Sequence, residues 1–343
     1  MTHDLNSAPA TLTIDLSAVA ANYDLIKQRA GCAVAGVIKA DAYGLGMEKI
    51  WAALESRNCP FYFVATPDEA LALRHLTKKP VAVLGGVYAG AEDEFIRHNI
   101  IPVLNTPEDL ERWRSAAKKH HIHLPAILHF DTGMNRLGFT VPPDQINADG
   151  LDIKIIMSHF SCADDKDHPL TAQQYERFQK IAAHFPAAQK SLANSAGVFR
   201  SRDYCFDLAR PGMALYGLNP TPETDNPMQP VVKLEARILQ VKKIARGDTV
   251  GYGASFRAEK ETNVATVALG YADGFPRSLS GSGTLYYNGY PCPVIGRVSM
   301  DAVTVDAGTQ ALRSGEMLEV LGAHQSADDL AAAAGTIGYE ILT

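Results

Sequence analysis

Residues 61–76 read Phe-Tyr-Phe-Val-Ala-Thr-Pro-Asp-Glu-Ala-Leu-Ala-Leu-Arg-His-Leu. The apolar run at 61–66 predicts a buried strand, and the stretch that begins at Pro67 predicts a helix. Thr66 is a typical N-cap residue, and Pro67 suits the first helical position. The two acidic residues that follow favour the start of a helix because they face the positive end of its dipole. The same order returns at residues 100–120, so a strand followed by a helix is the unit from which we predict the fold.

This unit recurs through the first two thirds of the chain. Strands alternating with helices predict a parallel sheet, and eight such units favour a closed TIM-like (β/α)8 barrel over an open doubly wound sheet. The candidate strands are 34–40, 61–66, 81–86, 100–105, 126–131, 153–159, 190–194 and 207–210. The predicted helices between them are 47–57, 67–76, 91–98, 107–120 and 171–185.

The last third of the chain is rich in strands instead. A Pro-rich stretch at 219–227 precedes this change, and Asn288-Gly289 predicts a hairpin turn. We therefore expect an N-terminal strand within residues 1–15 that joins a β domain, a barrel over 16–219, and a mainly β C-terminal domain over 220–343. The predicted strands there are 231–244, 263–269, 284–287, 293–298, 303–305 and 317–321, and a helix is predicted at 327–334.

Length, charge and cysteine content limit the class of protein. The chain has 343 residues, and its net charge of 32 − 38 = −6 gives no support for nucleic-acid or acidic-membrane binding. Its five cysteines are widely spaced without a C-x-x-C pair, which is typical of a reducing cytoplasm. No apolar run approaches the roughly 18 residues of a membrane span, and residues 1–6 do not resemble a signal peptide. The basic run at 118–123 has no acidic or cysteine residue close to it in the sequence, so we expect no metal site there. Together, the cysteine content and the lack of a membrane span or signal peptide predict a cytoplasmic protein that acts on a small molecule.

The predicted strands end in polar residues, and in this type of barrel those ends form the active site. They carry Lys39, Thr66, Asp131, His159, Asn194-Ser195 and Arg210. An enclosed lysine has a lowered amine pKa, which suits Schiff-base chemistry. The turns at 194–197 and 210–213 combine small residues with a hydroxyl and free N–H groups, which suit a phosphate. A lysine, phosphate-binding turns and an arginine at one barrel end point to pyridoxal phosphate as the cofactor.

With these residues in place, the chain resembles the alanine racemases, which are pyridoxal-phosphate-dependent enzymes built of a barrel and a β domain. The matching motifs run in family order along nearly the whole chain, and as a set they are specific. They are Val37–Gly46, Asp131–Arg136, Ser158–Phe160, Asn194–Ser195, Arg210–Gly217, Val250–Phe256, Gly270–Phe275, Gly296–Asp301 and Tyr339–Glu340.

The resemblance implies a role for each matching residue. Lys39 binds the cofactor aldehyde and moves a proton on one face of the substrate Cα, and Tyr252 of a second subunit acts on the other face. His159 and Arg210 support Tyr252, and Arg210 also faces the cofactor ring. The remaining cofactor-binding positions are Tyr43, Asn194, Ser195, Gly212, Met213 and Tyr339, and the substrate-binding positions are Arg136, Met300 and Tyr271.

These roles imply interconversion of L-alanine and D-alanine by two-base Cα proton transfer, with D-alanine supplied for peptidoglycan. They also imply a homodimer with shared active sites. A broader racemase that accepts serine is the first alternative. An amino-acid decarboxylase on the same scaffold is the second, and it would be expected to carry an acid in place of Arg210. A non-catalytic pyridoxal-phosphate carrier is the third, and it would lack the β domain and Tyr252.

Four positions depart from the family pattern. Many members carry a carbamylated lysine, which helps to orient Arg136, where this chain has His129. Because histidine does not form a stable carbamate, we expect no carbamylation there, and a water, an anion or the imidazole itself is left to hold Arg136. Leu45 and Ser299 replace a common histidine and a common cysteine, and both changes should be tolerated. The chain ends at Thr343, so the predicted phosphate contact of Tyr339 is expected to be less secure.

Overall fold

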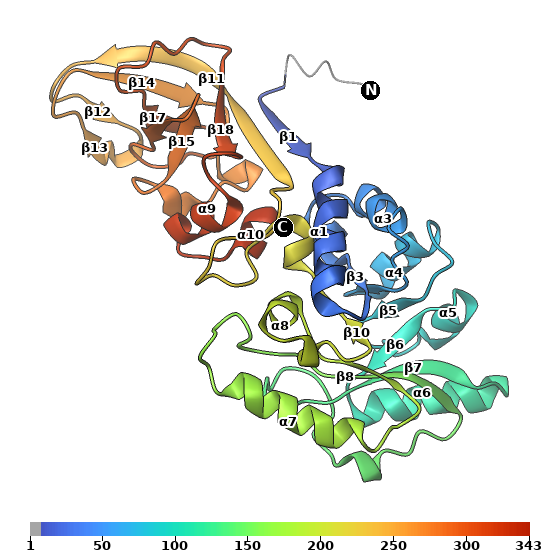
Figure 1. The fold of residues 1–343 in the computed structure, drawn as a ribbon. Helices are drawn as coiled ribbons and strands as arrows, with labels where there is room; N and C mark the ends of the chain where they lie inside the picture. Colours follow the sequence, from blue (N-terminus) through green and yellow to red (C-terminus); the bar gives the residue numbers. More distant parts are fainter. Residues whose placement is uncertain (1–7) are drawn as a thin grey trace. The chain divides into compact units, whose positions relative to one another are not determined.

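The computed structural model describes residues 8–343, which fold as two compact units (Figure 1). One unit spans residues 16–229, and the other combines residues 8–15 with residues 230–343. The N-terminal part of the chain thus contributes to the same unit as the C-terminal part. No helix among residues 8–343 is long and apolar enough to cross a membrane.

The unit of residues 16–229 is a parallel β/α barrel. Seven strands pair in chain order from β3 to β9, and β10 pairs in parallel with β2. The Arg210 amide donates to the Ala193 carbonyl at 2.9 Å, which joins β10 to the end of β9 and closes the ring. The predicted (β/α)8 barrel is therefore confirmed. Its strands are β2 (Ala33–Val34), β3 (Gly36–Val37), β4 (Tyr62–Val64), β5 (Val81–Val83), β6 (Ile101–Leu104), β7 (Leu124–His129), β8 (Leu151–Met157), β9 (Gln189–Ser191) and β10 (Leu208–Ala209).

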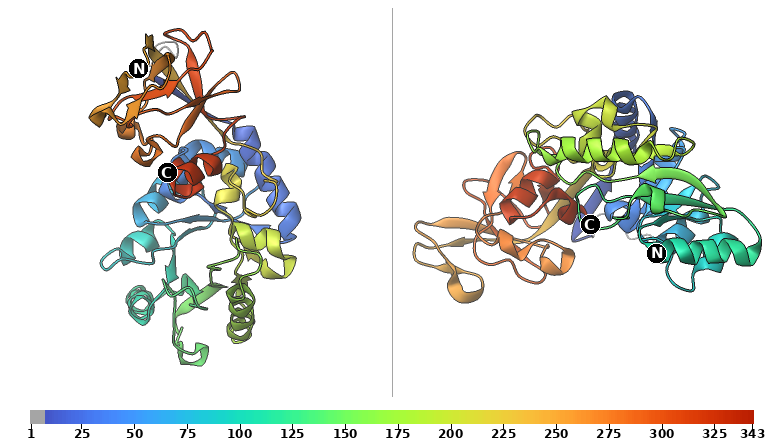
Figure 2. Two further views of the ribbon diagram at one scale, coloured as in Figure 1. Left: turned by 90° about the vertical axis from the view of Figure 1, so that its left-hand side faces the viewer. Right: turned by 90° about the horizontal axis from the view of Figure 1, so that it is seen from below.

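Helices cover the outside of the barrel strands (Figures 1 and 2). They are α1 (Leu16–Ala30), α3 (Met47–Glu55), α4 (Pro67–Arg74), α5 (Glu92–Arg97), α6 (Pro107–His120), α7 (Leu170–Ala182) and α8 (Ser195–Arg200). The short segment α2 (Lys39–Tyr43) is instead a left-handed turn that follows β3. The predicted caps are confirmed: the Thr66 and Thr106 side chains accept hydrogen bonds from the amides of Glu69 and Asp109. Helix α1 was not predicted; its first turn has no acidic residue, although Asp15, a preferred N-cap residue type, directly precedes it.

An antiparallel sheet forms the second unit, in the order β16-β15-β18-β11-β14-β17, with β1 paired to β11. Its buried core includes Ile238, Val267, Leu285 and Leu318. Its elements are β1 (Ala10–Ile14), β11 (Val232–Ile244), β12 (Thr249–Val250), β13 (Phe256–Arg257), β14 (Thr262–Val267), β15 (Thr284–Tyr287), β16 (Tyr290–Pro293), β17 (Val303–Asp306), β18 (Met317–Leu321), α9 (Ala327–Ala334) and α10 (Gly338–Leu342). The expected mainly β C-terminal domain is confirmed.

One predicted strand is shifted. We expected a strand over 293–298, whereas β16 covers Tyr290–Pro293. Asn288 and Gly289 have φ of 49° and 82°, which is the two-residue turn that best matches strand twist. Tyr290 therefore pairs with Tyr287 immediately after the turn, and the strand begins earlier than its apolar residues indicate.

The barrel unit runs to Gln229, beyond the boundary predicted at 219. The buried side chain of Asn22, on α1, holds the additional segment. Its Nδ2 donates to the Gln229 carbonyl at 2.9 Å, and its Oδ1 accepts from the Gln229 amide at 2.7 Å. These two bonds keep residues 220–229 with the barrel despite their Pro-rich composition.

We predict that Asn22→Ala lowers the free energy of unfolding by roughly 1–3 kcal/mol, because both Gln229 backbone groups lose their partner. Urea denaturation measures this change. Gln145→Ala is the control: the side chain of Gln145 is exposed, and its loss should cost no more than about 0.5 kcal/mol. Equal losses in the two variants would contradict the role given to Asn22.

Candidate active site at the carboxyl end of the barrel

The barrel interior ends in a layer of polar side chains. The buried interior cluster includes Val37, Val103, Ile127, Met157 and Leu208. Side chains alternate along a strand, so the residue two positions further points the same way. The five residues at those positions are Lys39, Asn105, His129, His159 and Arg210. The structure therefore brings together three of the predicted site residues, and it adds Asn105 and His129 to them.

Lys39 lies at the end of β3, where the backbone turns unusually. The four residues from Ala40 to Tyr43 have φ between 50° and 59°, a left-handed conformation that costs about 1–2 kcal/mol per residue for side chains other than glycine. Two carboxylates hold this turn: Asp41 accepts from the Met47 amide at 2.7 Å, and Glu69 accepts from the Ala40 amide at 2.6 Å. Burial and the nearby Arg136 lower the pKa of the Lys39 amine, which increases its neutral, nucleophilic fraction.

Arg210 is buried and bonded on several sides. Its guanidinium donates to the Ser191 hydroxyl, to the Ser158 carbonyl at 2.5 Å and to His159 Nδ1 at 3.4 Å. Burial lowers its pKa to about 9, so the group remains charged at neutral pH. Burial and Arg210 in turn hold the pKa of His159 well below its usual value, so this imidazole is neutral. Because Nδ1 accepts from Arg210, the single proton of His159 lies on Nε2.

The turns at 194–197 and 210–213 meet through one hydroxyl. Ser195 Oγ accepts from the amides of Gly212 and Ala214, at 3.0 and 3.2 Å. A hydroxyl that accepts two bonds still has its own proton to donate, which suits an anionic oxygen. A Cβ at Gly212 would lie 2.1 Å from the Tyr43 hydroxyl, so only glycine permits this approach. These residues fit the phosphate of the predicted cofactor.

Asn194 begins helix α8, where a phosphate-binding turn was predicted at 194–197. Its Oδ1 accepts from the Gly197 amide at 2.9 Å as the N-cap of α8, and its Nδ2 donates to the Phe160 carbonyl at 3.3 Å. Both ends of the side chain are thus bound to backbone. Asn194 thereby fixes the turn that presents Ser195. Met213 begins the short 3-10 helix that follows Gly212.

Arg136 is exposed on a loop that returns to the end of β7. The Phe139 amide donates to the His129 carbonyl at 2.7 Å, which closes the loop. The Asp131 carboxylate accepts from the amides of Gly133, Met134 and Asn135, which holds the loop base. These bonds hold the backbone of the loop, and none of them involves the Arg136 guanidinium.

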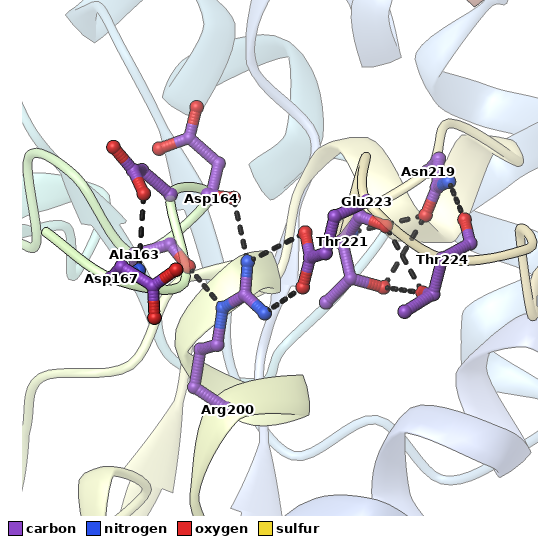
Figure 3. A network of polar contacts seen from close by, with 9 residues as sticks. Ala163, Asp164, Asp167, Arg200, Asn219, Thr221, Glu223 and Thr224 are labelled. Carbon is purple, nitrogen blue, oxygen red and sulfur yellow. Dashed lines mark hydrogen bonds and ion pairs between the residues drawn. The ribbon is translucent and has the colours of Figure 1, made fainter.

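A second network holds the loop that follows His159 (Figure 3). Arg200, at the end of α8, donates to the carbonyls of Ala163 and Asp164, at 2.7 and 2.6 Å, and to the Glu223 carboxylate. The loop after β8 and the segment before Gln229 are therefore tied to the same helix. This network restricts the loops around the polar layer without adding a charge to it.

The other predicted site residues lie in the second unit. Tyr252 is 73% exposed, Met300 58% and Tyr271 44%, and all three border one hollow that Arg277, Arg297 and Asp301 also line. Tyr339 lies in α10 and is 38% exposed. The exposure of Tyr252, which lies in a short 3-10 turn, is far higher than that of a tyrosine packed within a strand. The sequence-predicted site thus divides into two sets, one on each unit.

A lysine of lowered pKa, a buried arginine and a hydroxyl-bearing turn at one end of a barrel define a barrel-type pyridoxal-phosphate enzyme. Family models described as the alanine racemase N-terminal and C-terminal domains match residues 14–220 and 231–343. The chain therefore belongs to the alanine racemase family of pyridoxal-phosphate-dependent isomerases.

Known relatives resemble the chain over nearly its whole length. It is 43% identical to a catabolic alanine racemase of Mesorhizobium japonicum, with 98% of this chain and 91% of the relative covered. It is 40% identical to a biosynthetic alanine racemase of Agrobacterium fabrum, with 100% and 93% covered. The crystal structure of alanine racemase from Bartonella henselae, with covalently bound pyridoxal phosphate, superimposes with a TM-score of 0.94 at 38% identity, covering 98% of this chain and 96% of that one.

Sequence reasoning missed two residues that shape this site. Glu69 was assigned only to the dipole of α4, yet it also binds the backbone beside Lys39. Asn105 was seen only as the end of a strand. Its position two residues after an interior valine was the available signal, because it places an amide in the same layer as Arg210.

We predict that Gly212→Ala lowers the free energy of unfolding by roughly 1–3 kcal/mol, because the new methyl group overlaps the Tyr43 hydroxyl. Tyr43→Phe removes the overlapping oxygen and should recover part of that loss in the double variant. Denaturation of the parent, both single variants and the double variant measures the coupling. Strictly additive losses would show that the two residues do not compete for this space.

Proposed function

We propose that this protein interconverts L-alanine and D-alanine. The observation that carries the proposal is the polar layer at the barrel end. Lys39 lies in this layer together with His159 and Arg210, which are hydrogen-bonded to each other. Family membership supplies the reaction type, and the relatives named above are called alanine racemases. Both catabolic and biosynthetic names occur among them. The proposed reaction is the interconversion itself, and supply of D-alanine for peptidoglycan is its proposed use.

Pyridoxal phosphate, when bound, would withdraw electrons from the substrate Cα and so make its proton removable. Lys39 would attach it. Tyr43, Ser195, Gly212, Met213 and Tyr339 would hold its phosphate. The lowered pKa of Lys39 favours its neutral amine at neutral pH, and a neutral amine can accept a proton from the substrate.

Arg210 is the residue that we assign to the nitrogen of the cofactor ring. Its charge disfavours a second positive charge beside it, and among residues 8–343 its hydrogen bonds go to a hydroxyl, a carbonyl and an imidazole rather than to a carboxylate. An acid at this place would protonate the ring and strengthen it as an electron sink. Arg210 therefore favours return of the proton to Cα, which supports racemisation over decarboxylation.

Tyr252 is the base that we assign to the opposite face of Cα. A free tyrosine has a pKa of about 10, so it needs a neighbour that stabilises its phenolate at neutral pH. His159 carries its proton on Nε2 and is held by Arg210, so it is prepared to donate to such an oxygen. Arg136 and Met300 would receive the substrate carboxylate, and Tyr271 would line the approach to it.

The exposed side chains of the second unit support a homodimer with shared sites. Tyr252, Tyr271 and Met300 are large, exposed and grouped at one hollow. Large exposed aromatic residues gathered at one place are typical of surfaces that bind a partner. We assign these three residues to the active site of a second subunit.

All five cysteines are free thiols, which supports action in the cytoplasm.

The reaction is tested by incubating the pyridoxal-phosphate-loaded protein with L-alanine in deuterium oxide. We expect D-alanine and deuterium at Cα, and Lys39→Ala should reduce both by roughly 100- to 10,000-fold. Chiral chromatography and mass spectrometry follow the two products. Loss of carbon dioxide would favour the decarboxylase, and absence of any exchange would favour a non-catalytic pyridoxal-phosphate carrier. Parallel incubation with L-serine measures the substrate range.

Shared active sites are tested by mixing two inactive variants, Lys39→Ala and Tyr252→Phe. A hybrid dimer would contain one site with both parent residues, so activity should return toward a quarter of the parent value on random exchange of subunits, by simple counting of sites. Differently tagged chains verify that exchange occurs. Verified hybrids that stay inactive would contradict the assignment of Tyr252 to the partner's site.

A further inference from the structure

A buried glutamine that the proposed reaction does not use lies against the backbone of His159. Gln174, on α7, is 0% exposed. Together with Thr171, Phe178 and Ala182 it forms the inward face of that helix, at helical spacing. Such a face normally buries apolar side chains, so a glutamine there needs partners for its polar groups.

The side-chain amide of Gln174 makes every hydrogen bond of which it is capable. Its Nε2 donates to the His159 carbonyl at 2.9 Å and to Thr132 Oγ1 at 3.4 Å. Its Oε1 accepts from the amide and the hydroxyl of Ser161, at 3.0 and 3.1 Å. Two donors and two acceptors are the full capacity of this group, and all four bonds go to the loops that follow β7 and β8.

Thr132 extends this contact to Ser158. The hydroxyls of Thr132 and Ser158 lie 2.7 Å apart, and the two residues are 2% and 1% exposed. Thr132 is itself held by α7, because Arg177, one turn after Gln174, donates to its carbonyl at 2.8 Å. Helix α7 therefore binds Thr132 at both its carbonyl and its hydroxyl.

The dipeptide Ser158-His159 is consequently held from two directions. Arg210 donates to the Ser158 carbonyl at 2.5 Å and to His159 Nδ1 at 3.4 Å. Thr132 and Gln174 bind the Ser158 hydroxyl and the His159 carbonyl. The bond from Arg210 to the imidazole is long, so it fixes the ring only if the backbone at residue 159 is fixed independently.

We propose that Gln174, assisted by Thr132, is a positioning residue for His159. Its four bonds fix the backbone of residues 158–161, so that His159 Nε2 lies where the tyrosine that acts on the second face of Cα can reach it. This role of His159 rests on the proposed function, whereas the bonds of Gln174 do not. Loss of Gln174 should therefore slow the proton transfer at Tyr252 and spare the one at Lys39.

Amide hydrogen exchange of the pyridoxal-phosphate-loaded protein tests the bonds of Gln174 without any activity. The Ser161 amide donates to Gln174 Oε1, so Gln174→Met should make it exchange roughly tenfold faster. Mass spectrometry with fragmentation assigns the exchange to this residue. The matched control is Gln173→Leu, at an exposed position next to it on α7, which should leave Ser161 unchanged. Unchanged exchange in Gln174→Met would overturn the proposal.

Kinetic isotope effects test the action on His159. Each enantiomer of alanine loses its Cα proton to one base and gains a proton from the other. In Gln174→Met, kcat should fall about 10- to 100-fold in both directions, because the support of Tyr252 is misplaced. With alanine deuterated at Cα, the isotope effect should rise for the enantiomer whose proton Tyr252 removes. It should fall for the other, because removal by Lys39 then limits the rate less. A general loosening of the site would slow both transfers and move the two isotope effects together.

Two further variants complete the kinetic test. Asn22→Ala destabilises the barrel unit through the Gln229 segment, and it should leave both isotope effects unchanged. Thr132→Val keeps the bond from Gln174 to His159 but loses the hydroxyl that reaches Ser158, so it should shift both isotope effects in the same sense as Gln174→Met, by less. If Gln174→Met does not fold, Thr132→Val decides alone.

Isotope effects that move together in Gln174→Met, or that stay at the parent values in Thr132→Val, would overturn the proposal. A parent protein that does not interconvert the alanine enantiomers would count against the proposed function alone. Exchange at Ser161 would still decide whether Gln174 holds the loop.

Discussion

A buried arginine without a carboxylate partner among residues 8–343 is the constraint on which the barrel end depends. Arg210 connects the ends of three strands. Its guanidinium donates to Ser158, which follows β8, and to Ser191 on β9, and its own amide, after β10, donates to the Ala193 carbonyl. A buried charge is costly unless its hydrogen bonds are met, so these partners must stay in place. That requirement orients His159 and determines which of its nitrogens carries the proton.

The carboxylates near this layer are bound by backbone amides rather than by its cations. Asp131 holds the amides at 133–135, and Glu69 holds those of Ala40, Ala65 and Thr66. The positive charges of Arg136 and Arg210 are consequently left for a ligand, whereas the lowered pKa of Lys39 favours its neutral amine. An excess of cations with a free hydroxyl at Ser195 suits an anionic cofactor and a substrate carboxylate. Glu69 also stabilises the strained turn after Lys39, through the Ala40 amide, so charge balance and backbone geometry are coupled there.

Much of the fold was predictable because its signals are local. Thr66 and Thr106 cap helices through bonds to residues three positions away, and Asn288-Gly289 closes a hairpin within two residues. Helix α1 was missed even though Asp15, a preferred N-cap residue type, directly precedes it. The left-handed turn at 40–43 was also missed, because alanine and tyrosine do not favour it locally, and the bond that holds its first amide comes from Glu69, which lies 29 residues away on α4.

The sequence by itself determined the strand and helix order, the residues at the strand ends and the family to which they point. Those properties follow from periodicity, capping and motif spacing along one chain. Only the tertiary structure decided that Ser195 joins the turn at Gly212, that Asn105 lies against His129, and that Arg210 donates to His159 Nδ1. A proton's position depends on which donor or acceptor lies across from it, and those partners come from strands far apart in the sequence.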